Sequence, residues 1–360
     1  MGTHGWVWRV DREATMRALR YGILGSGFMG RTHAAAIQHI EDAELVAVAG
    51  GSRAPGVAAD YGAQLCESDE ALIARDDIDA VIIATPQFAH ARQALAAAAR
   101  RKHLFIEKPM ATTVADAEAI VAACAKHGVA LSVGYQQRYR AVPRAAREQV
   151  QAGAIGQIHT IQFYQVFQLF TDPAFGGDWS WWANPAAVGH ILAGGVHGID
   201  LCRWMLGAEV TSAFGHSRTF REQQEPENTT MGLLTFDNGT IMALWASSAC
   251  PQPGFPGLAF RAQLMGETGM LDMDAYDTLR LANDGGWRTI VEQPPVGTEQ
   301  AATAFGFPRL KAYVDQLRAF TEAALAGTPP PVSGEDGLVG VQIALALLES
   351  SRTGQLVRLR

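Results

Sequence analysis

Short apolar runs alternate with longer helix-forming segments between residues 20 and 134. Most of these runs lack alternation of polar and apolar positions, which is typical of strands covered on both faces. Segments 89–101 and 114–127 have a helix-forming composition, and Gly128 follows the second as a helix-ending residue. Repeated strand and helix predict a doubly wound α/β domain with a parallel sheet. Strands are expected at 21–24, 45–49, 80–84, 103–106 and 129–133.

After about residue 143 the pattern changes to strands joined by short turns. The turn-forming residues at 237–239 and 266–269 suit antiparallel hairpins. We therefore expect a second, α+β domain with a large, mostly antiparallel open sheet. Its strands are expected at 158–166, 230–236, 240–247 and 260–265, and helices with apolar faces at 308–327 and 337–350.

Composition narrows the class of protein. The chain has 360 residues, 48% of them hydrophobic and 18% charged, which suits a soluble protein of two domains. Its 29 Lys and Arg against 36 Asp and Glu give a net charge of −7, so neither nucleic acid nor an anionic membrane is an expected partner. Small molecules remain the expected ligands.

The apolar runs, the N-terminal segment and the cysteine spacing bear on the cellular compartment of the protein. No apolar run approaches the roughly 18 residues that cross a bilayer, and residues 1–20 lack the continuous apolar segment of a secretory signal. The four cysteines are widely separated and form no Cys-x-x-Cys pair, so neither a zinc knuckle nor a disulfide framework is expected. A reducing cytoplasm is the simplest expectation.

A glycine motif directly follows the first expected strand and opens the first expected helix. It reads Gly25-Ser26-Gly27-Phe28-Met29-Gly30, in the G-x-G-x-x-G pattern. Such glycines allow a tight turn, close backbone approach to a pyrophosphate and close helix packing, while the helix N-terminus attracts the anion. A glycine turn in another kind of α/β protein is the alternative. The position in the chain favours a dinucleotide-binding Rossmann domain.

The end of the second expected strand bears on the choice of dinucleotide. An NAD-selective site usually carries Asp or Glu about 20 residues after the motif. Here the chain reads Gly50-Gly51-Ser52-Arg53. Ser52 and Arg53 are suited to donate hydrogen bonds to a 2′-phosphate. We therefore expect NADP(H) to be favoured over NAD(H), with a solvated loop charge as the alternative for Arg53.

From about residue 19 to its end, the chain resembles the Gfo/Idh/MocA family of oxidoreductases. The likeness rests on five segments. They are Gly25–Gly30, Ala84-Thr85-Pro86 with His90, Glu107-Lys108-Pro109, the stretch from Gly195 to Trp204, and residues 332–337. The resemblance implies an N-terminal Rossmann domain at 19–142 and a substrate-binding and oligomerisation domain at 143–360, after an extension at 1–18. It also implies a homodimer or homotetramer.

The resemblance implies that Lys108 orients the substrate and handles a proton near the nicotinamide. Glu107 is either a cofactor contact or structural. His197 is the expected acid or base, because an imidazole titrates near neutral pH. Asp200 and His197 are three residues apart on an expected helix and so share a face. Asp200 is expected to contact substrate, orient the imidazole or cap the helix.

One position departs from the family pattern. Many members carry Asp four residues before the catalytic histidine, where this chain has Ala193. We therefore expect Lys108 and His197 to act without a carboxylate. His190 is expected to be a core or capping residue. A metal site built from His190, His197 and Asp200 is a weak rival, because their spacing matches no strong zinc signature, and no metal is expected.

Further positions match family contacts. Thr85, Pro86, His90 and Gln136 are expected to contact cofactor, and Arg138 to contact substrate. Independently of the family, Trp181 belongs to a cluster of three tryptophans ahead of the expected His197 helix, and it is expected to contact substrate, with core packing as the alternative. The expected reaction interconverts a hydroxyl and a carbonyl group on a sugar, cyclitol or related cyclic alcohol. The family's range leaves a dihydrodiol dehydrogenase, a cofactor-dependent glycosidase and a non-catalytic dinucleotide sensor as alternatives.

Overall fold

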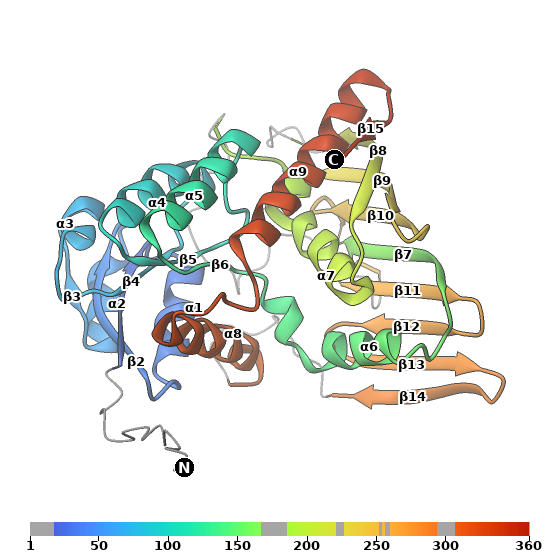
Figure 1. Cartoon of the computed structure of the whole chain (residues 1–360), viewed down its shortest axis with the longest axis horizontal. Helices are drawn as coiled ribbons and strands as arrows, with labels where there is room; N and C mark the ends of the chain where they lie inside the picture. Colours follow the sequence, from blue (N-terminus) through green and yellow to red (C-terminus); the bar gives the residue numbers. More distant parts are fainter. Residues whose placement is uncertain are drawn as a thin grey trace, which may run out of the picture.

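The structure is a computed structural model, and it describes residues 18–166, 186–220, 227–251, 254–255, 260–293 and 307–359. The predicted extension therefore lies almost wholly outside the described residues, and so does Trp181. Figure 1 shows two sheets side by side, each with its own helices, and the long helix α9 crossing between them.

The first sheet is parallel and has six strands in the order β3-β2-β1-β4-β5-β6, which confirms the predicted doubly wound domain. Its apolar strands are buried on both faces, as their continuous apolar runs indicate. The unpredicted strand, β3, has only two residues and both are exposed, so it lacks an apolar signal. The strands are β1 (Leu19–Leu24), β2 (Ala43–Ala49), β3 (Gln64–Leu65), β4 (Ala80–Ile83), β5 (His103–Ile106) and β6 (Leu131–Val133).

Helices connect these strands and lead into the second domain. Thr113 caps α5 through Asp116 N, and Gly128 ends it in a left-handed conformation, as predicted. The helices are α1 (Phe28–Ile37), α2 (Ala54–Tyr61), α3 (Asp69–Ile73), α4 (His90–Ala99), α5 (Val114–His127) and α6 (Ala141–Gln151), with short 3₁₀ turns η1 (Gln87–Ala89) and η2 (Gln136–Tyr139).

The second sheet has nine strands in the order β14-β13-β12-β11-β7-β10-β9-β8-β15. Only β7 and β10 pair in parallel, so the predicted mostly antiparallel sheet is confirmed. The strands are β7 (Ile158–Val166), β8 (Val210–Arg218), β9 (Thr229–Phe236), β10 (Ile241–Ser247), β11 (Arg261–Gly266), β12 (Met270–Asp274), β13 (Thr278–Asn283), β14 (Gly286–Glu292) and β15 (Val357–Arg358).

Helices α6, α7 (Val196–Leu206) and α9 (Gly334–Thr353) pack on one face of this sheet. Helix α9 begins three residues before the expected position, because Ser333 and Asp336 form a capping box there. Its first half contacts the Rossmann domain, and Ser350 Oγ accepts a hydrogen bond from Gly215 N on β8.

Helix α8 (Phe307–Ala326) completes the core of the first domain although it comes late in the chain. The Phe320 ring lies 5.7 Å from the Phe105 ring on β5, and the hydroxyls of Tyr21 and Thr321 are 2.7 Å apart. The apolar face predicted for this helix is thus buried against β1, β5 and α1. The nucleotide-binding half of the molecule is therefore built from both ends of the chain.

Candidate active site

Two glycines of the motif are required by contacts inside the protein. Gly25 has φ of 100°, and a Cβ added there would lie 2.4 Å from the carbonyl oxygen of Ala84. A Cβ at Gly30 would lie 1.9 Å from the Gly25 carbonyl oxygen. Both positions therefore exclude any larger residue. They bring the start of α1 close against the ends of β1 and β4.

Gly27 differs from these two because nothing lies within 4 Å of an added Cβ. It is exposed and immediately precedes α1, and no side chain caps that helix. Phe28 and Met29, both half-buried, form the first residues of the helix. Open space at an uncapped helix N-terminus fits a pyrophosphate held by backbone N–H groups.

The end of β2 turns away next to this motif through two glycines. Gly50 and Gly51 have φ of 81° and 82°, and a Cβ on Gly51 would lie 2.6 Å from Ser26 Oγ. Ser52 and Arg53 follow and are exposed. Arg53 makes no ion pair with any residue in the described ranges, so its guanidinium faces solvent beside the turn.

His90 ties together the loops that follow β4 and β5. Its ring nitrogens lie 2.9 Å from the carbonyl oxygen of Thr85 and 3.0 Å from that of Pro109. Burial lowers the pKa of His90. The Thr85 hydroxyl donates to Gln93 on α4 at 2.6 Å. Both side chains thus hold the loop of Thr85 and Pro86 in place at the end of β4.

Two buried amide side chains follow strands on either side of β5. Gln87, 5% exposed, has no hydrogen-bond partner for Nε2, and Gln136, 7% exposed, has none for Oε1. An unsatisfied buried polar group costs about 1–3 kcal/mol, so such atoms favour a ligand that would pair with them. Sequence reasoning included Gln136 and missed Gln87, whose position directly after Pro86 was the available signal.

Glu107 is held by a residue that sequence reasoning missed. His33 Nε2, on α1, lies 2.8 Å from Glu107 Oε1, and both residues are at least 94% buried. Burial alone would raise the pKa of Glu107, but the hydrogen bond and charge of His33 and the charge of Lys108 lower it. A Cβ on Gly134 would lie 2.9 Å from this carboxylate. Glu107 is therefore an internal anchor that fixes the start of the Lys108 loop.

Lys108 crosses from the first domain to the second. Its Nζ donates a 2.8 Å hydrogen bond to the carbonyl oxygen of Ala193. Ala193 lies in a π-helical turn, Ile191–Gly195, which immediately precedes α7. Burial lowers the pKa of Lys108, while Glu107 opposes that change. A backbone carbonyl, and not a carboxylate, thus holds the amine.

His197 lies one turn further along, on α7. It is 7% exposed, its Nδ1 has no hydrogen-bond partner, and its ring is 6.0 Å from that of Tyr135. Burial and the charges of Lys108 and Arg140 lower the pKa of His197 well below its usual value. The imidazole is therefore neutral, and Nδ1 is free of a hydrogen bond within the described residues, but the lowered pKa makes it a weaker base than an ordinary histidine. The same causes, without Arg140, lower the pKa of His190 to about 3.

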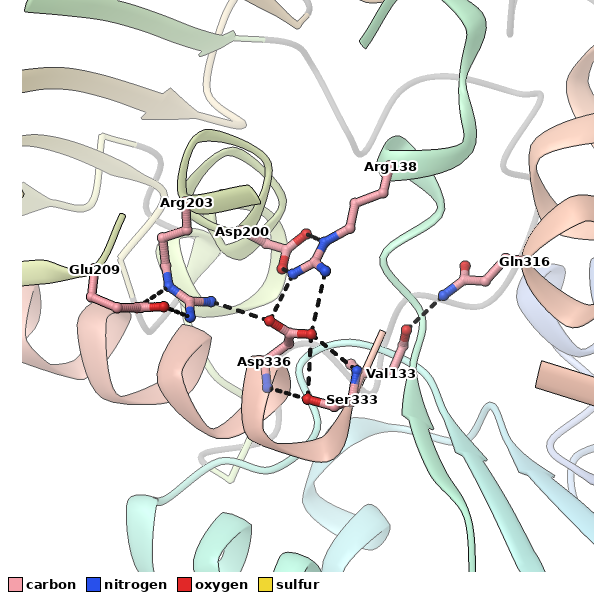
Figure 2. Close-up of polar contacts among 8 residues, drawn as sticks. All are labelled: Val133, Arg138, Asp200, Arg203, Glu209, Gln316, Ser333 and Asp336. Atoms are coloured by element: carbon pink, nitrogen blue, oxygen red, sulfur yellow. Dashed lines mark hydrogen bonds and ion pairs between the residues drawn. The ribbon is translucent and has the colours of Figure 1, made fainter. Parts of the chain in front are cut away.

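Arg138 and Asp200 contact each other in a buried ionic network (Figure 2). Arg138 donates to Asp200 from Nε at 2.9 Å and from Nη2 at 2.5 Å, and it contacts Asp336 at 2.8 Å. Burial opposes its charge, but these two carboxylates raise the pKa of Arg138 further. Arg203 extends the network from Asp336 to Glu209.

This network joins three elements, namely η2, α7 and the capped start of α9 (Figure 2). Both Arg138 and Asp200 were expected to contact substrate, which stays a prediction, and in the structure each binds the other. Asp200 lies three residues after His197 on α7, so the network positions the helix that carries the imidazole. The Ser333-x-x-Asp336 spacing was a capping signal that sequence reasoning did not use.

Other classes of site find no support within the described ranges. They contain no group of three His, Cys, Asp or Glu side chains placed to hold a metal ion. Nor do any of their helices have the length and apolarity needed to cross a bilayer.

Comparison with known proteins places this geometry in a family. Residues 19–135 match the model described as "Oxidoreductase family, NAD-binding Rossmann fold", and residues 144–272 match "GFO/IDH/MocA C-terminal domain". A scyllo-inositol 2-dehydrogenase (NAD(+)) of Bacillus subtilis is 27% identical over 95% of this chain and 96% of its own length. A D-apiose dehydrogenase of Paraburkholderia graminis is 28% identical over 96% of this chain and 91% of its own.

Solved structures agree on the fold. An oxidoreductase domain protein from Kribbella flavida superposes with a TM-score of 0.83 at 25% identity, covering 96% of this chain and 100% of that one. Scyllo-inositol dehydrogenase from Lactobacillus casei, solved with NAD(H) and scyllo-inositol, gives 0.76 at 24% identity, over 95% and 99% of the two chains. With both of its domains matched and its glycine turn, lysine and histidine in the arrangement described above, the chain belongs to the Gfo/Idh/MocA family of NAD-binding Rossmann-fold oxidoreductases.

Proposed function

We propose that this protein is an NAD(P)-dependent oxidoreductase that interconverts a hydroxyl and a carbonyl group on a sugar, cyclitol or related cyclic alcohol. The observation that carries the proposal is the hydrogen bond by which Lys108, from the first domain, contacts Ala193, four residues before His197 in the second domain. Lys108 Nζ contacts the turn that leads into α7, and its charge acts on the His197 imidazole. Relatives named as inositol and apiose dehydrogenases support the substrate class.

In this mechanism the bound nicotinamide supplies the site that accepts the hydride. The backbone at Gly27 and the amides of Gln87 and Gln136 would hold the dinucleotide, as their open space and unpaired atoms suit. His197, neutral and without a hydrogen bond to Nδ1, accepts the proton of the substrate hydroxyl. Lys108 donates to the same oxygen and stabilises the charge that develops there.

The test is turnover of a panel of inositols, hexoses and cyclic diols, followed by nicotinamide absorbance. We expect His197→Ala and Lys108→Met each to lower kcat about 10²- to 10⁴-fold, because each removes a proton-transfer or charge-stabilising group. Dinucleotide affinity should change little in His197→Ala. Normal turnover by His197→Ala would refute the assignment. Dinucleotide binding without turnover of any compound would instead favour a sensor.

For the cofactor we propose a preference for NADP(H). Ser52 and Arg53 are exposed beside the glycine turn, and residues 50–53, which follow β2, include no Asp or Glu. The inositol dehydrogenase relative is named for NAD(+), so the two dinucleotides must be compared directly. Fluorescence titration should show tighter binding of NADPH than NADH, and Arg53→Ala should remove the difference. Tighter binding of NADH by the unaltered protein would refute the preference.

We also propose that the protein forms a homodimer or homotetramer through the open face of the second sheet. Phe214, Met231 and Leu233 are 43%, 58% and 51% exposed on neighbouring strands, and they line a shallow hollow with Trp245. An exposed apolar patch of this kind marks an interaction site. Light scattering should show the oligomer, and Leu233→Glu should lower its mass toward that of one chain.

A cytoplasmic location completes the proposal. All four cysteines are free and three of them are buried, which suits a reducing compartment. Fractionation of cells that express the full chain would test it, and recovery outside the cytoplasm would refute it.

A further inference from the structure

Arg140 is a buried arginine without a carboxylate. It is 7% exposed, and its Nε has no hydrogen-bond partner. Across the described ranges no ion pair involves its guanidinium, whose only contact of note is with the ring of Tyr276 at 4.6 Å. A buried charge is normally paired, because desolvation costs several kcal/mol. Arg138, two residues earlier, illustrates the usual case with two carboxylates.

The position of Arg140 connects it with the candidate active site. It ends η2, which packs against α7, the helix of His197, and whose Arg138 binds Asp200 on that helix. The charge of Arg140 also lowers the pKa of His197. Gln137 Nε2 donates to the Tyr276 hydroxyl at 2.8 Å, which holds in place the ring on which the guanidinium stacks. Stacking fixes the plane of the guanidinium and leaves its N–H groups to be satisfied by another molecule.

The charges around His197 are unbalanced. Lys108 and Arg140 both act on it as cations. The carboxylates that could compensate are engaged elsewhere, since Glu107 binds His33 and Asp200 binds Arg138. Ala193, whose carbonyl oxygen accepts from Lys108, has no carboxylate to offer. The site therefore has an excess of positive charge before a substrate enters.

We propose that Arg140 binds the carboxylate of an acidic substrate, so that the protein acts on a sugar acid or a cyclitol acid. The proposal rests on the proposed function. Lys108 is directed to the reacting oxygen, which leaves one planar cation to match one planar anion through two parallel hydrogen bonds. The carboxylate would then orient the ring so that a hydroxyl group faces His197. The substrate carboxylate would then supply the negative charge that Ala193 does not provide.

The dinucleotide is the competing partner for Arg140. Its pyrophosphate is expected at Gly27, beside Phe28, and the arginine over the Phe28 ring is Arg309, at 4.5 Å. The affinity for NADP(H) and NAD(H) in the Arg140 variants decides between the two partners. A loss of dinucleotide affinity equal to the loss of acid affinity would overturn the proposal.

The kinetic test uses D-glucuronate, D-galacturonate and D-mannuronate, each against its parent hexose. We expect kcat/KM of the unaltered protein to be at least about tenfold higher for the best acid than for its hexose. Arg140→Met should lower the value for the acid about 30-fold or more, as loss of one partner of a buried charge pair does, and the value for the hexose less than threefold. Equal losses for acid and hexose would overturn the proposal.

Two further variants control for folding and for general charge. Arg140→Lys keeps the charge and should retain part of the preference for the acid, even if Arg140→Met folds poorly. Arg144→Met removes an exposed arginine of α6 that stacks on Tyr139 of η2, and it should leave the preference unchanged. A loss of preference in Arg144→Met as large as in Arg140→Met would overturn the proposal.

A binding measurement separates this inference from the proposed function. Calorimetry should show that the three acids bind the dinucleotide-loaded protein more tightly than their hexoses do, and that Arg140→Met removes the difference. Such binding without turnover would support the role of Arg140 while refuting the oxidoreductase. Turnover of hexoses with no binding of any acid would support the oxidoreductase and refute the role of Arg140.

Discussion

Asp200→Asn tests whether the buried ionic network positions the catalytic helix. Asp200 is completely buried and accepts two hydrogen bonds from Arg138. Breaking a buried ion pair by altering one partner costs about 3–5 kcal/mol. Arg138 retains Asp336 at 2.8 Å, so we expect a loss near the lower limit, about 3 kcal/mol. That loss corresponds to a thermal midpoint roughly 6–12 °C lower for a domain of this size.

The assay is thermal denaturation followed by circular dichroism, together with kcat and dinucleotide affinity. We expect kcat to fall, because α7 also carries His197, while dinucleotide affinity changes little. Glu209→Gln is the matched control. Glu209 bonds to Arg203 at 2.7 Å, but its side chain is 60% exposed, so its loss should cost less than about 1 kcal/mol. Equal destabilisation by the two variants would refute the argument that burial decides the strength of this network.

Three further predictions follow from the site and its supports. Gly27→Ala should fold normally and bind dinucleotide at least about tenfold more weakly by fluorescence titration. Gly30→Ala should instead lose at least about 1–3 kcal/mol of stability, because its Cβ meets the Gly25 carbonyl. Equal thermal midpoints for the two variants would contradict this difference. Burial raises the pKa of Glu227 from 4.5 to about 7, which favours its protonated form in the folded state. Its contribution to stability is therefore complete below pH 4.5 and is lost as pH rises through 7, so Glu227→Gln should flatten the urea midpoint between pH 4.5 and 7. Because burial lowers the pKa of Lys108, kcat/KM should fall with rising pH at a value below 10.5, and a profile flat to that pH would contradict its role.

Local rules predict the parts of this structure that depend on neighbours in sequence. The glycine motif is interpretable from sequence because its spacing and its place between a strand and a helix are local. Only part of the clearance it needs is local, since Gly30 meets Gly25 but Gly25 meets Ala84, which follows β4. The parallel sheet is likewise predictable from continuous apolar runs. The resemblance to a family supplied Lys108 and His197, since no local pattern relates two residues 89 positions apart in the printed sequence.

Partners across the fold were beyond sequence reasoning. The spacing of His197 and Asp200 predicts a shared helix face, but it does not reveal that Arg138 lies opposite Asp200. Arg140 gives no sequence signal either, because a buried unpaired arginine and an exposed one look the same in a chain. Its burial depends on η2 packing near Tyr276, which comes 136 positions later.

The late position of α8 has a consequence for how the protein is made. A ribosome synthesises the strands and helices up to residue 142 long before it reaches Phe307, yet Phe320 and Thr321 close the core around Phe105 and Tyr21. During translation, part of the apolar surface of the nucleotide-binding half therefore stays uncovered until α8 is synthesised. We expect a nascent chain that stalls before α8 to bind chaperones, and to leave them only after α8 has been synthesised.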